Sequence, residues 1–154
     1  MAVSGVTPFL WYDDDLEEAI ASYGRIFGAS ELDDVRRYPD GRLFTASFEV
    51  AGQRVFAMNA GPGHPHTDAF SFFVDIEGGQ AEVDRHWEAF LAEGATEVAC
   101  GWLTDRFGVS WQIVPQELMT AQTDPDPERA RYANDAVMKM KKIVIADLYP
   151  ESAA

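Results

Sequence analysis

The same order of apolar patterns occurs twice in this chain of 154 residues, and the repeat limits the folds that the chain can adopt. Each copy has a strand-like run, then a segment of helical periodicity, then further strand-like runs separated by turns. Tyr23 and Phe27 in the first helical segment lie 64 positions before Trp87 and Leu91 in the second. Self-similarity at a fixed spacing is typical of a duplicated structural unit, so we expect two strand–helix–strands modules in tandem.

The first module is predicted from its apolar runs and its turn residues. Residues 6–12, 43–50 and 54–59 favour strands, and Gly28 is a natural end for the helix that precedes the second of them. The apolar face of that helix consists of Leu16, Ala19, Ile20, Tyr23 and Phe27.

Three consecutive aspartates at residues 13–15 can be interpreted in two ways. They could form a metal-binding carboxylate cluster. They could also form the first turn of the helix, because Asp14 and Asp15 each stand three residues before a glutamate, as in a capping box. Negative charge stabilises a helix N-terminus, and the helical pattern that starts at Leu16 favours this second interpretation.

The second module repeats the pattern of the first. Its strands are expected at residues 69–76, 96–103 and 109–114, and its helix is expected to begin at about residue 80. We expect a single domain over residues 1–154, with the modules at about 5–62 and 66–120 and a C-terminal helical extension at about 124–148.

The helix of the extension is predicted from its cap. Asp126 can serve as the N-cap, and proline is favoured at the first helical position, which Pro127 occupies. Lys139, Lys141 and Lys142 would then lie at the C-terminus of this helix, where the helix dipole favours cations.

The charge balance excludes several classes of partner. Twelve Lys and Arg against 26 Asp and Glu give a net charge of −14, and such a surface repels phosphate backbones and anionic lipids. No apolar run approaches the roughly 20 residues that span a bilayer, and the first residues lack the basic and apolar regions of a signal peptide. We therefore expect a soluble cytoplasmic protein that binds neither nucleic acid nor membranes.

Few residues suit metal binding or nucleophilic catalysis. His64 and His66 form an H-x-H pair, but their glycine- and proline-rich loop does not ensure that both rings point to one side. Cys100 could be a nucleophile, yet no histidine partner is evident in the sequence, so a buried structural thiol is favoured. Phosphate-binding glycine loops and the G-x-S-x-G motif are absent from the sequence.

Several stretches of the sequence resemble one known family. The longest is CGWLTDRFGVSWQIVP at residues 100–115, and the others are TPFLWYD at 7–13, the segment 23–28, DPDPE at 124–128 and MKMKKI at 138–143. Together they resemble the PhnB-like family, which carries the description 3-demethylubiquinone-9 3-methyltransferase. That family belongs to the glyoxalase, bleomycin-resistance and dioxygenase superfamily, also called the vicinal oxygen chelate superfamily.

The resemblance implies an α+β fold. Two βαβββ modules would form a U-shaped, eight-stranded mixed sheet around a cleft, usually in a homodimer, and the extra C-terminal helix would pack on the dimer or on the sheet. The implied activities range from metal-dependent isomerases, dioxygenases and thiol transferases to metal-free proteins that sequester drugs, so the fold alone does not select one of them.

The superfamily's metal site takes His, Gln and Glu side chains from four strand ends. By position, these four slots fall near Thr7 or Pro8, near Asn59, at Thr67 and at Gln112. None of these residues is a carboxylate or an imidazole, and neutral oxygen donors alone bind a divalent cation weakly. We therefore expect no catalytic metal and no cofactor; the alternative is a shift in register that brings His66 together with Gln112.

The methyltransferase description is not expected to describe the chemistry. S-adenosylmethionine is usually bound by a glycine-rich loop after the first strand of a doubly wound sheet, whereas three aspartates follow the first predicted strand here. If the protein is an enzyme, we expect a glyoxalase- or dioxygenase-type activity.

The sequence thus predicts that the protein binds a small apolar or aromatic molecule against the sheet. Trp11 and Trp102 are predicted as aromatic walls, and Asn59 and Gln112 as hydrogen-bonding residues that orient the ligand. The alternative is a metal-dependent enzyme of the glyoxalase or dioxygenase type. A chelator would abolish the activity of the metal-dependent enzyme and would leave metal-free ligand binding unchanged.

Overall fold

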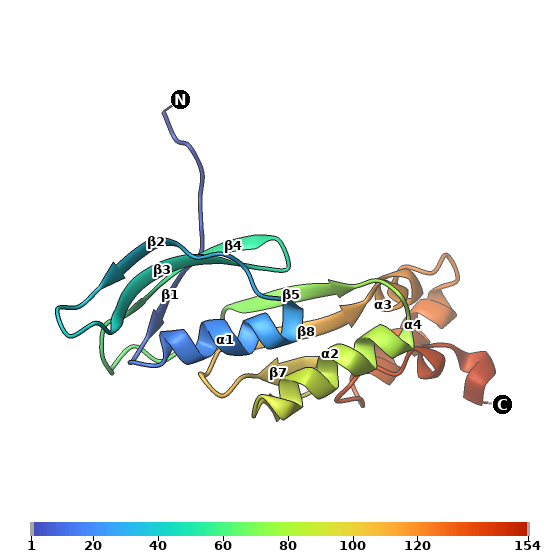
Figure 1. The fold of residues 1–154 in the computed structure, drawn as a ribbon. Helices are drawn as coiled ribbons and strands as arrows, with labels where there is room; N and C mark the ends of the chain where they lie inside the picture. The colour runs from blue at the N-terminus through green and yellow to red at the C-terminus, as the bar shows by residue number, and fades with distance from the viewer. Residues whose placement is uncertain (1, 154) are drawn as a thin grey trace. The chain divides into compact units, whose positions relative to one another are not determined.

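The computed structural model describes residues 2–153, and its chain falls into two compact units. The first unit extends to His66 and the second begins at Thr67. Each unit contains its own four-stranded sheet and its own long helix (Figure 1). The predicted duplication and the α+β class are therefore confirmed, and the eight strands form two four-stranded mixed sheets.

The first unit has the order strand, helix and three strands. Its elements are β1 (Phe9–Tyr12), α1 (Leu16–Phe27), β2 (Asp33–Arg37), β3 (Leu43–Val50) and β4 (Gln53–Asn59). The sheet order is β1-β4-β3-β2, with β1 parallel to β4 and the other neighbours antiparallel. The predicted strand at 43–50 and the helix end at Gly28, whose φ is 100°, are confirmed.

The second unit repeats this order and this sheet topology. Its elements are β5 (Ser71–Ile76), α2 (Gln80–Ala92), β6 (Thr96–Glu97), β7 (Trp102–Thr104) and β8 (Ser110–Pro115). The sheet order is β5-β8-β7-β6, with β5 parallel to β8. The single strand expected at 96–103 is wrong, because a turn at Ala99–Gly101 divides it into two short strands.

Each long helix covers one face of its own sheet. In the first unit, Tyr23 of α1 hydrogen bonds through its hydroxyl to Tyr12 of β1 at 2.9 Å and stacks on Phe48 of β3. In the second unit, Phe90 of α2 lies against Trp111 of β8, which in turn stacks on Phe72 of β5. Because strand side chains alternate, these contacts identify the helix side of each sheet and leave the opposite face without a helix from its own module.

A buried carboxylate fixes the last turn of the second sheet. Asp105 accepts hydrogen bonds from the backbone N–H groups of Phe107 and Val109 and from the indole Nε1 of Trp111, each at 2.9 Å. The turn between β7 and β8 is therefore tied to the largest core side chain of β8.

The chain after β8 contains more elements than the sequence predicts. They are α3 (Gln116–Gln122), α4 (Pro127–Val137) and two short 3-10 helices, η1 (Ile145–Leu148) and η2 (Pro150–Ala153). Figure 1 shows α3 and α4 beside the C-terminal ends of β5 and β8. Their apolar residues form one cluster with the end of β8, consisting of Val114, Leu118, Ala121, Ala133, Val137, Ile143 and Leu148.

The predicted start of α4 is confirmed and its predicted end is wrong. The Asp126 side chain accepts a hydrogen bond from the N–H of Glu128, and Pro127 is the first helical residue. The helix ends at Val137, so the three lysines lie beyond it rather than in its last turn. One of them, Lys142, instead pairs with Asp84 of α2 at 2.8 Å and lowers the pKa of that carboxyl below its usual value.

Backbone hydrogen bonds fasten the segment after α4 to the second unit. The N–H groups of Cys100 and Gly101 donate to the carbonyls of Met140 and Lys141 at 2.8 and 2.7 Å. The Gln80 side chain donates to the carbonyl of Ile143 and accepts from the N–H of Ile145. The extension is therefore bound both at the turn before β7 and at the start of α2.

Gly101 is the residue that permits this close approach. Its φ is +83°, and a Cβ at this position would lie 2.7 Å from Cδ1 of Ile143 and 3.0 Å from the carbonyl oxygen of Ile113. A side chain at residue 101 therefore meets both a strained backbone conformation and occupied space.

We predict that Gly101→Ala lowers the free energy of unfolding by about 1–3 kcal/mol more than Gly94→Ala does. Gly94 is a matched control, because its φ is +87° and a Cβ there would meet only the Arg106 side chain at 3.6 Å. Urea denaturation of both variants measures the difference. Equal losses would contradict the close packing of Ile143 against residue 101.

Candidate functional site

The candidate site lies on the face of each sheet that its own helix leaves uncovered, here called the helix-free face. On the second sheet the strand alternation assigns to this face Ser71, Phe73 and Asp75 of β5, Thr96 of β6, Trp102 and Thr104 of β7, and Ser110, Gln112 and Val114 of β8. Val114 at one end is buried by the C-terminal cluster, whereas Phe73 and Asp75 are exposed.

Gln112, which the sequence analysis proposes as a ligand-orienting residue, lies at the middle of this face. It is the direct neighbour of Phe73 on β5 and of Trp102 on β7. Its Nε2 donates a hydrogen bond to Oγ of Ser71 at 2.9 Å, and its Oε1 accepts none from residues 2–153. The structure therefore brings together two predicted site residues, Trp102 and Gln112.

Phe73 belongs to the same group, although the sequence reasoning missed it. Its side chain is 52% exposed, which is unusual for a phenylalanine in the middle of a strand. The signal was present in the alternation of β5, because Phe73 falls between Ser71 and Asp75 on the face that otherwise carries polar residues. The run of apolar residues around it concealed this alternation.

The helix-free face of the first sheet is also aromatic. Phe9 of β1 and Phe56 of β4 make an edge-to-face contact at 4.8 Å between ring centroids. Trp11 lies on the same face, where its indole Nε1 donates to the carbonyl of Gly61 at 2.7 Å. The centroid of its ring lies 4.1 Å from the ring centroid of His64. The predicted aromatic residue Trp11 is therefore held by the loop that follows β4.

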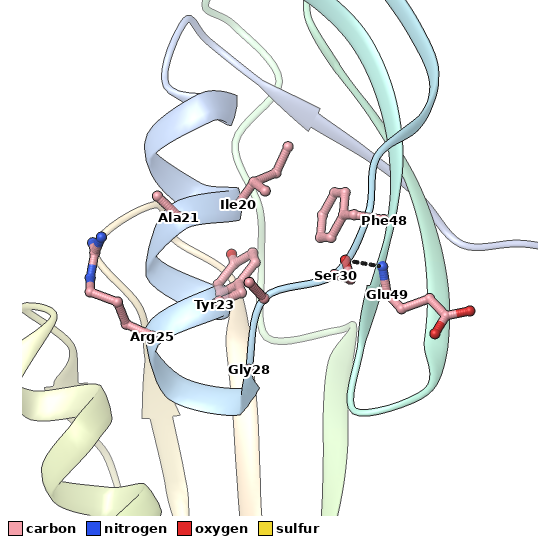
Figure 2. Close-up of a pocket in the computed structure, with 10 residues that line it drawn as sticks. Ile20, Ala21, Tyr23, Arg25, Gly28, Ser30, Phe48 and Glu49 are labelled. Atoms are coloured by element: carbon pink, nitrogen blue, oxygen red, sulfur yellow. Dashed lines mark hydrogen bonds between the residues drawn. The ribbon is translucent and has the colours of Figure 1, made fainter.

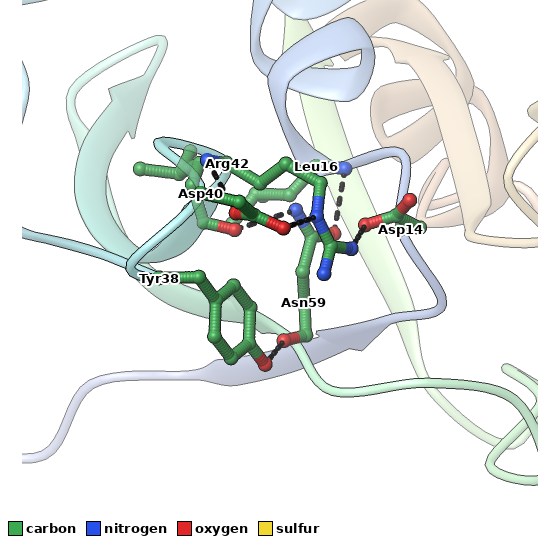
Figure 3. Close-up of polar contacts among 7 residues, drawn as sticks. Asp14, Leu16, Tyr38, Asp40, Arg42 and Asn59 are labelled. Atoms are coloured by element: carbon green, nitrogen blue, oxygen red, sulfur yellow. Dashed lines mark hydrogen bonds and ion pairs between the residues drawn. The ribbon is translucent and has the colours of Figure 1, made fainter.

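Asn59 does not lie on a helix-free face, because the register of β4 places its side chain on the helix side with Tyr12. Its Oδ1 accepts a hydrogen bond from the N–H of Leu16, and its Nδ2 donates to the carbonyl of Leu43, both at 3.0 Å (Figure 3). The side chain is buried and both ends of its amide are used within the fold. The structure thus gives Asn59 a structural role in place of the predicted ligand contact.

The Asn59 amide also replaces the predicted capping box. Helix α1 begins at Leu16, as expected, but the Asp15 side chain makes no capping hydrogen bond. The Asp14 carboxylate pairs instead with Nη1 of Arg42 at 2.8 Å. A side chain from the end of β4 therefore satisfies the first N–H of the helix.

Charged groups near this helix start are paired with one another. Arg42 binds Asp40 through Nε at 2.8 Å, in addition to Asp14, and its guanidinium lies 5.1 Å from the ring centre of Tyr38 (Figure 3). The hydrogen bond from Arg42 lowers the pKa of the Asp40 carboxyl below its usual value. The Tyr38 hydroxyl donates to the backbone carbonyl of Asn59 at 2.7 Å.

Metal ligands do not gather in the described part of the chain. No group of three or more His, Cys, Asp and Glu side chains that could hold a metal ion occurs within residues 2–153. His66 packs its ring edge-on against Tyr12 at 5.5 Å, and its buried Nε2 has no hydrogen-bond partner there. Cys100 is half-buried, with its Sγ 3.7 Å from Sδ of Met138.

A separate cavity of about 280 Å³ lies beside α1 in the first unit. Figure 2 shows Ile20 and Tyr23 of α1 on one side of it and Phe48, Ser30 and Glu49 on the other. The Ser30 hydroxyl accepts a hydrogen bond from the N–H of Glu49 at 3.0 Å and closes the loop there. No pattern in the sequence predicts this cavity.

A family model agrees with the architecture described above. The model described as 3-demethylubiquinone-9 3-methyltransferase matches residues 4–114, which include both sheets almost completely. The C-terminal elements from α3 onward lie beyond this match. No functionally curated protein matches the chain.

Solved structures with the same fold include the PhnB protein of Bacillus cereus, described as a 3-demethylubiquinone-9 3-methyltransferase. It is 27% identical over 70% of this chain and 96% of its own, with a TM-score of 0.61. Protein PA1353 of Pseudomonas aeruginosa is 22% identical over 71% of this chain and 95% of its own, with a TM-score of 0.56.

A third similar structure is the fosfomycin resistance protein FosX of Listeria monocytogenes, complexed with Mn(II) and 1S,2S-dihydroxypropylphosphonic acid. It is 20% identical over 71% of this chain and 90% of its own, with a TM-score of 0.54. These likenesses confirm the predicted glyoxalase and bleomycin-resistance type of fold. No helix within residues 2–153 is long and apolar enough to cross a membrane.

We predict that Asn59→Ala lowers the free energy of unfolding by about 2–4 kcal/mol, because it leaves a buried N–H and a buried carbonyl without partners. Asn134→Ala is the control, since its exposed amide bonds within and between surface helices and its loss is expected to cost less than about 1 kcal/mol. Urea denaturation checks both values. Unchanged stability of Asn59→Ala together with lost ligand binding would restore the ligand role.

Proposed function

Because the chain belongs to the 3-demethylubiquinone-9 3-methyltransferase family of PhnB-like proteins, we propose that it binds a small apolar or aromatic molecule on the helix-free faces of its sheets. The observation that carries this proposal is the group formed by Phe73, Trp102 and Gln112 on the second sheet. An exposed ring in mid-strand, a tryptophan and an amide on one face provide the mixture of apolar surface and few polar groups that is typical of small-molecule sites.

Polar atoms left over on this face support the same proposal. The indole N–H of Trp102 and Oε1 of Gln112 make no hydrogen bond with residues 2–153. A ligand could therefore accept one hydrogen bond and donate another without displacing a contact of the fold. Covering an exposed aromatic side chain in addition stabilises a complex by about 1–3 kcal/mol.

The second candidate function is a metal-dependent enzyme of the glyoxalase or dioxygenase type. The observation in its favour is the buried Nε2 of His66, which has no partner among the described residues and could serve as one ligand. A stable site for a divalent metal would need further imidazole or carboxylate ligands. We propose the metal-free binding function because Gln112 and Thr67 supply only neutral oxygen atoms.

The family's description as a methyltransferase is not part of the proposal. The sheets have the orders β1-β4-β3-β2 and β5-β8-β7-β6, unlike a doubly wound parallel sheet. The turn after β1 carries Asp13 and Asp14, whose negative charges would repel the carboxylate of S-adenosylmethionine. If turnover occurs, a glyoxalase- or dioxygenase-type reaction is the class to test.

We predict that Phe73→Ala and Gln112→Ala each weaken the binding of the neutral apolar dye Nile red by about threefold or more, because each removes a contact at the centre of the face. Dye fluorescence titration measures the dissociation constants. Met119→Ala is the control, since Met119 is 50% exposed on α3, outside the sheet. Equal affinities of all four proteins would contradict the proposed site.

We predict that the protein retains well under one metal ion per chain after incubation with iron, manganese, nickel and zinc and thorough dialysis. The physical reason is the lack of charged or imidazole ligands at the positions discussed above. Elemental analysis by mass spectrometry gives the ratio. Retention of about one metal per chain, and its loss in His66→Ala, would favour the metal-dependent enzyme instead.

A further inference from the structure

The helix-free face of the second sheet carries one charged strand residue, and this residue is acidic. Among the nine strand residues of this face, Asp75 is the single charged side chain, and the others are apolar, hydroxyl or amide groups. Asp75 is exposed, and its carboxylate makes no hydrogen bond or ion pair with any residue in the range 2–153. No lysine or arginine of these strands faces a ligand there.

The unpaired state of Asp75 contrasts with that of five carboxylates elsewhere in the structure. Asp14 and Asp40 share Arg42, Asp33 and Asp34 share Arg54, and Asp84 binds Lys142. In each case an internal cation neutralises the carboxylate. At Asp75 no cation of the described residues 2–153 competes for the carboxylate, which is therefore available to a cationic group of a ligand.

The spacing between the carboxylate and the aromatic residues fits one small molecule. Asp75 follows Phe73 by two residues on the same face of β5, which corresponds to a separation of about 6.6 Å along the strand. Gln112 neighbours Phe73, and Trp102 neighbours Gln112, so the rings and the carboxylate lie along one continuous surface. A planar ring on the aromatic residues would hold a short substituent near Asp75.

We infer that the ligand of this face is a cationic aromatic compound, with a planar ring that packs on Phe73 and Trp102 and a protonated amine or amidine that pairs with Asp75. This inference rests on the proposed binding function and adds the charge of the ligand to it. The net charge of −14 acts in the same direction, because the field of the whole protein attracts cations and repels anions.

Anionic ligands are disfavoured on this face. Phosphonates and carboxylates are recognised by arginine, lysine or backbone N–H groups, and the strand residues of this face provide no cationic side chain. The dihydroxypropylphosphonic acid found with Mn(II) in the FosX structure is a ligand of that opposite charge. A shared fold is therefore compatible with a ligand of different charge here.

The test compares three naphthalene compounds that differ in charge: naphthylmethylamine as the cation, naphthalenemethanol as the neutral compound and naphthoate as the anion. Each is titrated into the ¹⁵N-labelled full-length protein, with the Gln112 side-chain amide and the Trp102 indole N–H as local NMR probes. We expect the amine to bind about three- to tenfold more tightly than the alcohol, and the acid to bind most weakly. The preference should decrease with added salt.

The variant Asp75→Asn tests the assigned carboxylate. It should reduce the amine-to-alcohol affinity ratio to near one and leave the affinity for the alcohol unchanged. Glu88→Gln is the matched control, because it removes the same charge from an exposed position on α2 and should leave the ratio as it is in the unaltered protein.

The outcomes separate this inference from the proposed function. Equal affinities for amine and alcohol, or equal effects of Asp75→Asn and Glu88→Gln, would overturn the cationic ligand and leave binding of an aromatic molecule standing. Failure of all three compounds and of Nile red to bind would overturn both. Tightest binding of the acid would overturn the inference by reversing its sign.

Discussion

The first unit depends on the amide of Asn59, which joins its helix to its sheet. One carboxamide satisfies the first N–H of α1 and the carbonyl at the start of β3, and the backbone of the same residue accepts the hydroxyl of Tyr38. Buried polar groups stabilise a structure only when their hydrogen bonds are complete, and they then permit few alternative arrangements. In the second unit Asp105 has a comparable role, because its two oxygens hold the last turn and Trp111.

The two faces of each sheet differ in their packing. The helix side contains the interlocked aromatic rings and closed hydrogen bonds, so a substitution there acts first on folding. The helix-free side of the second sheet has polar groups with unused hydrogen-bonding capacity and the exposed ring of Phe73. In a duplicated fold of this kind, binding specificity can change on one side while the packing on the other side stays constant.

Local signals in the sequence predicted the elements well, and contacts between distant residues account for the errors. The start of α2 at Gln80 and the Asp126 cap of α4 follow from side chains within one helical turn, and both are confirmed. The capping group of α1 comes from a residue 43 positions away, so no local pattern could indicate it. For the same reason the sequence did not indicate that the Asn59 amide is used up within the fold, whereas the neighbouring positions of Trp102 and Gln112 leave their ligand role a prediction.

The C-terminal segment can be regarded as a ligand that the chain carries for itself. It binds through the carbonyls of Met140 and Lys141 and through the apolar cluster around Val114, yet it lies outside the segment that the family model matches. Since it is covalently attached, its effective concentration is high and independent of dilution. Its binding free energy therefore adds directly to the stability of the second sheet, and the part of the chain that folds together with this sheet extends beyond residue 114, where the match to the family model ends.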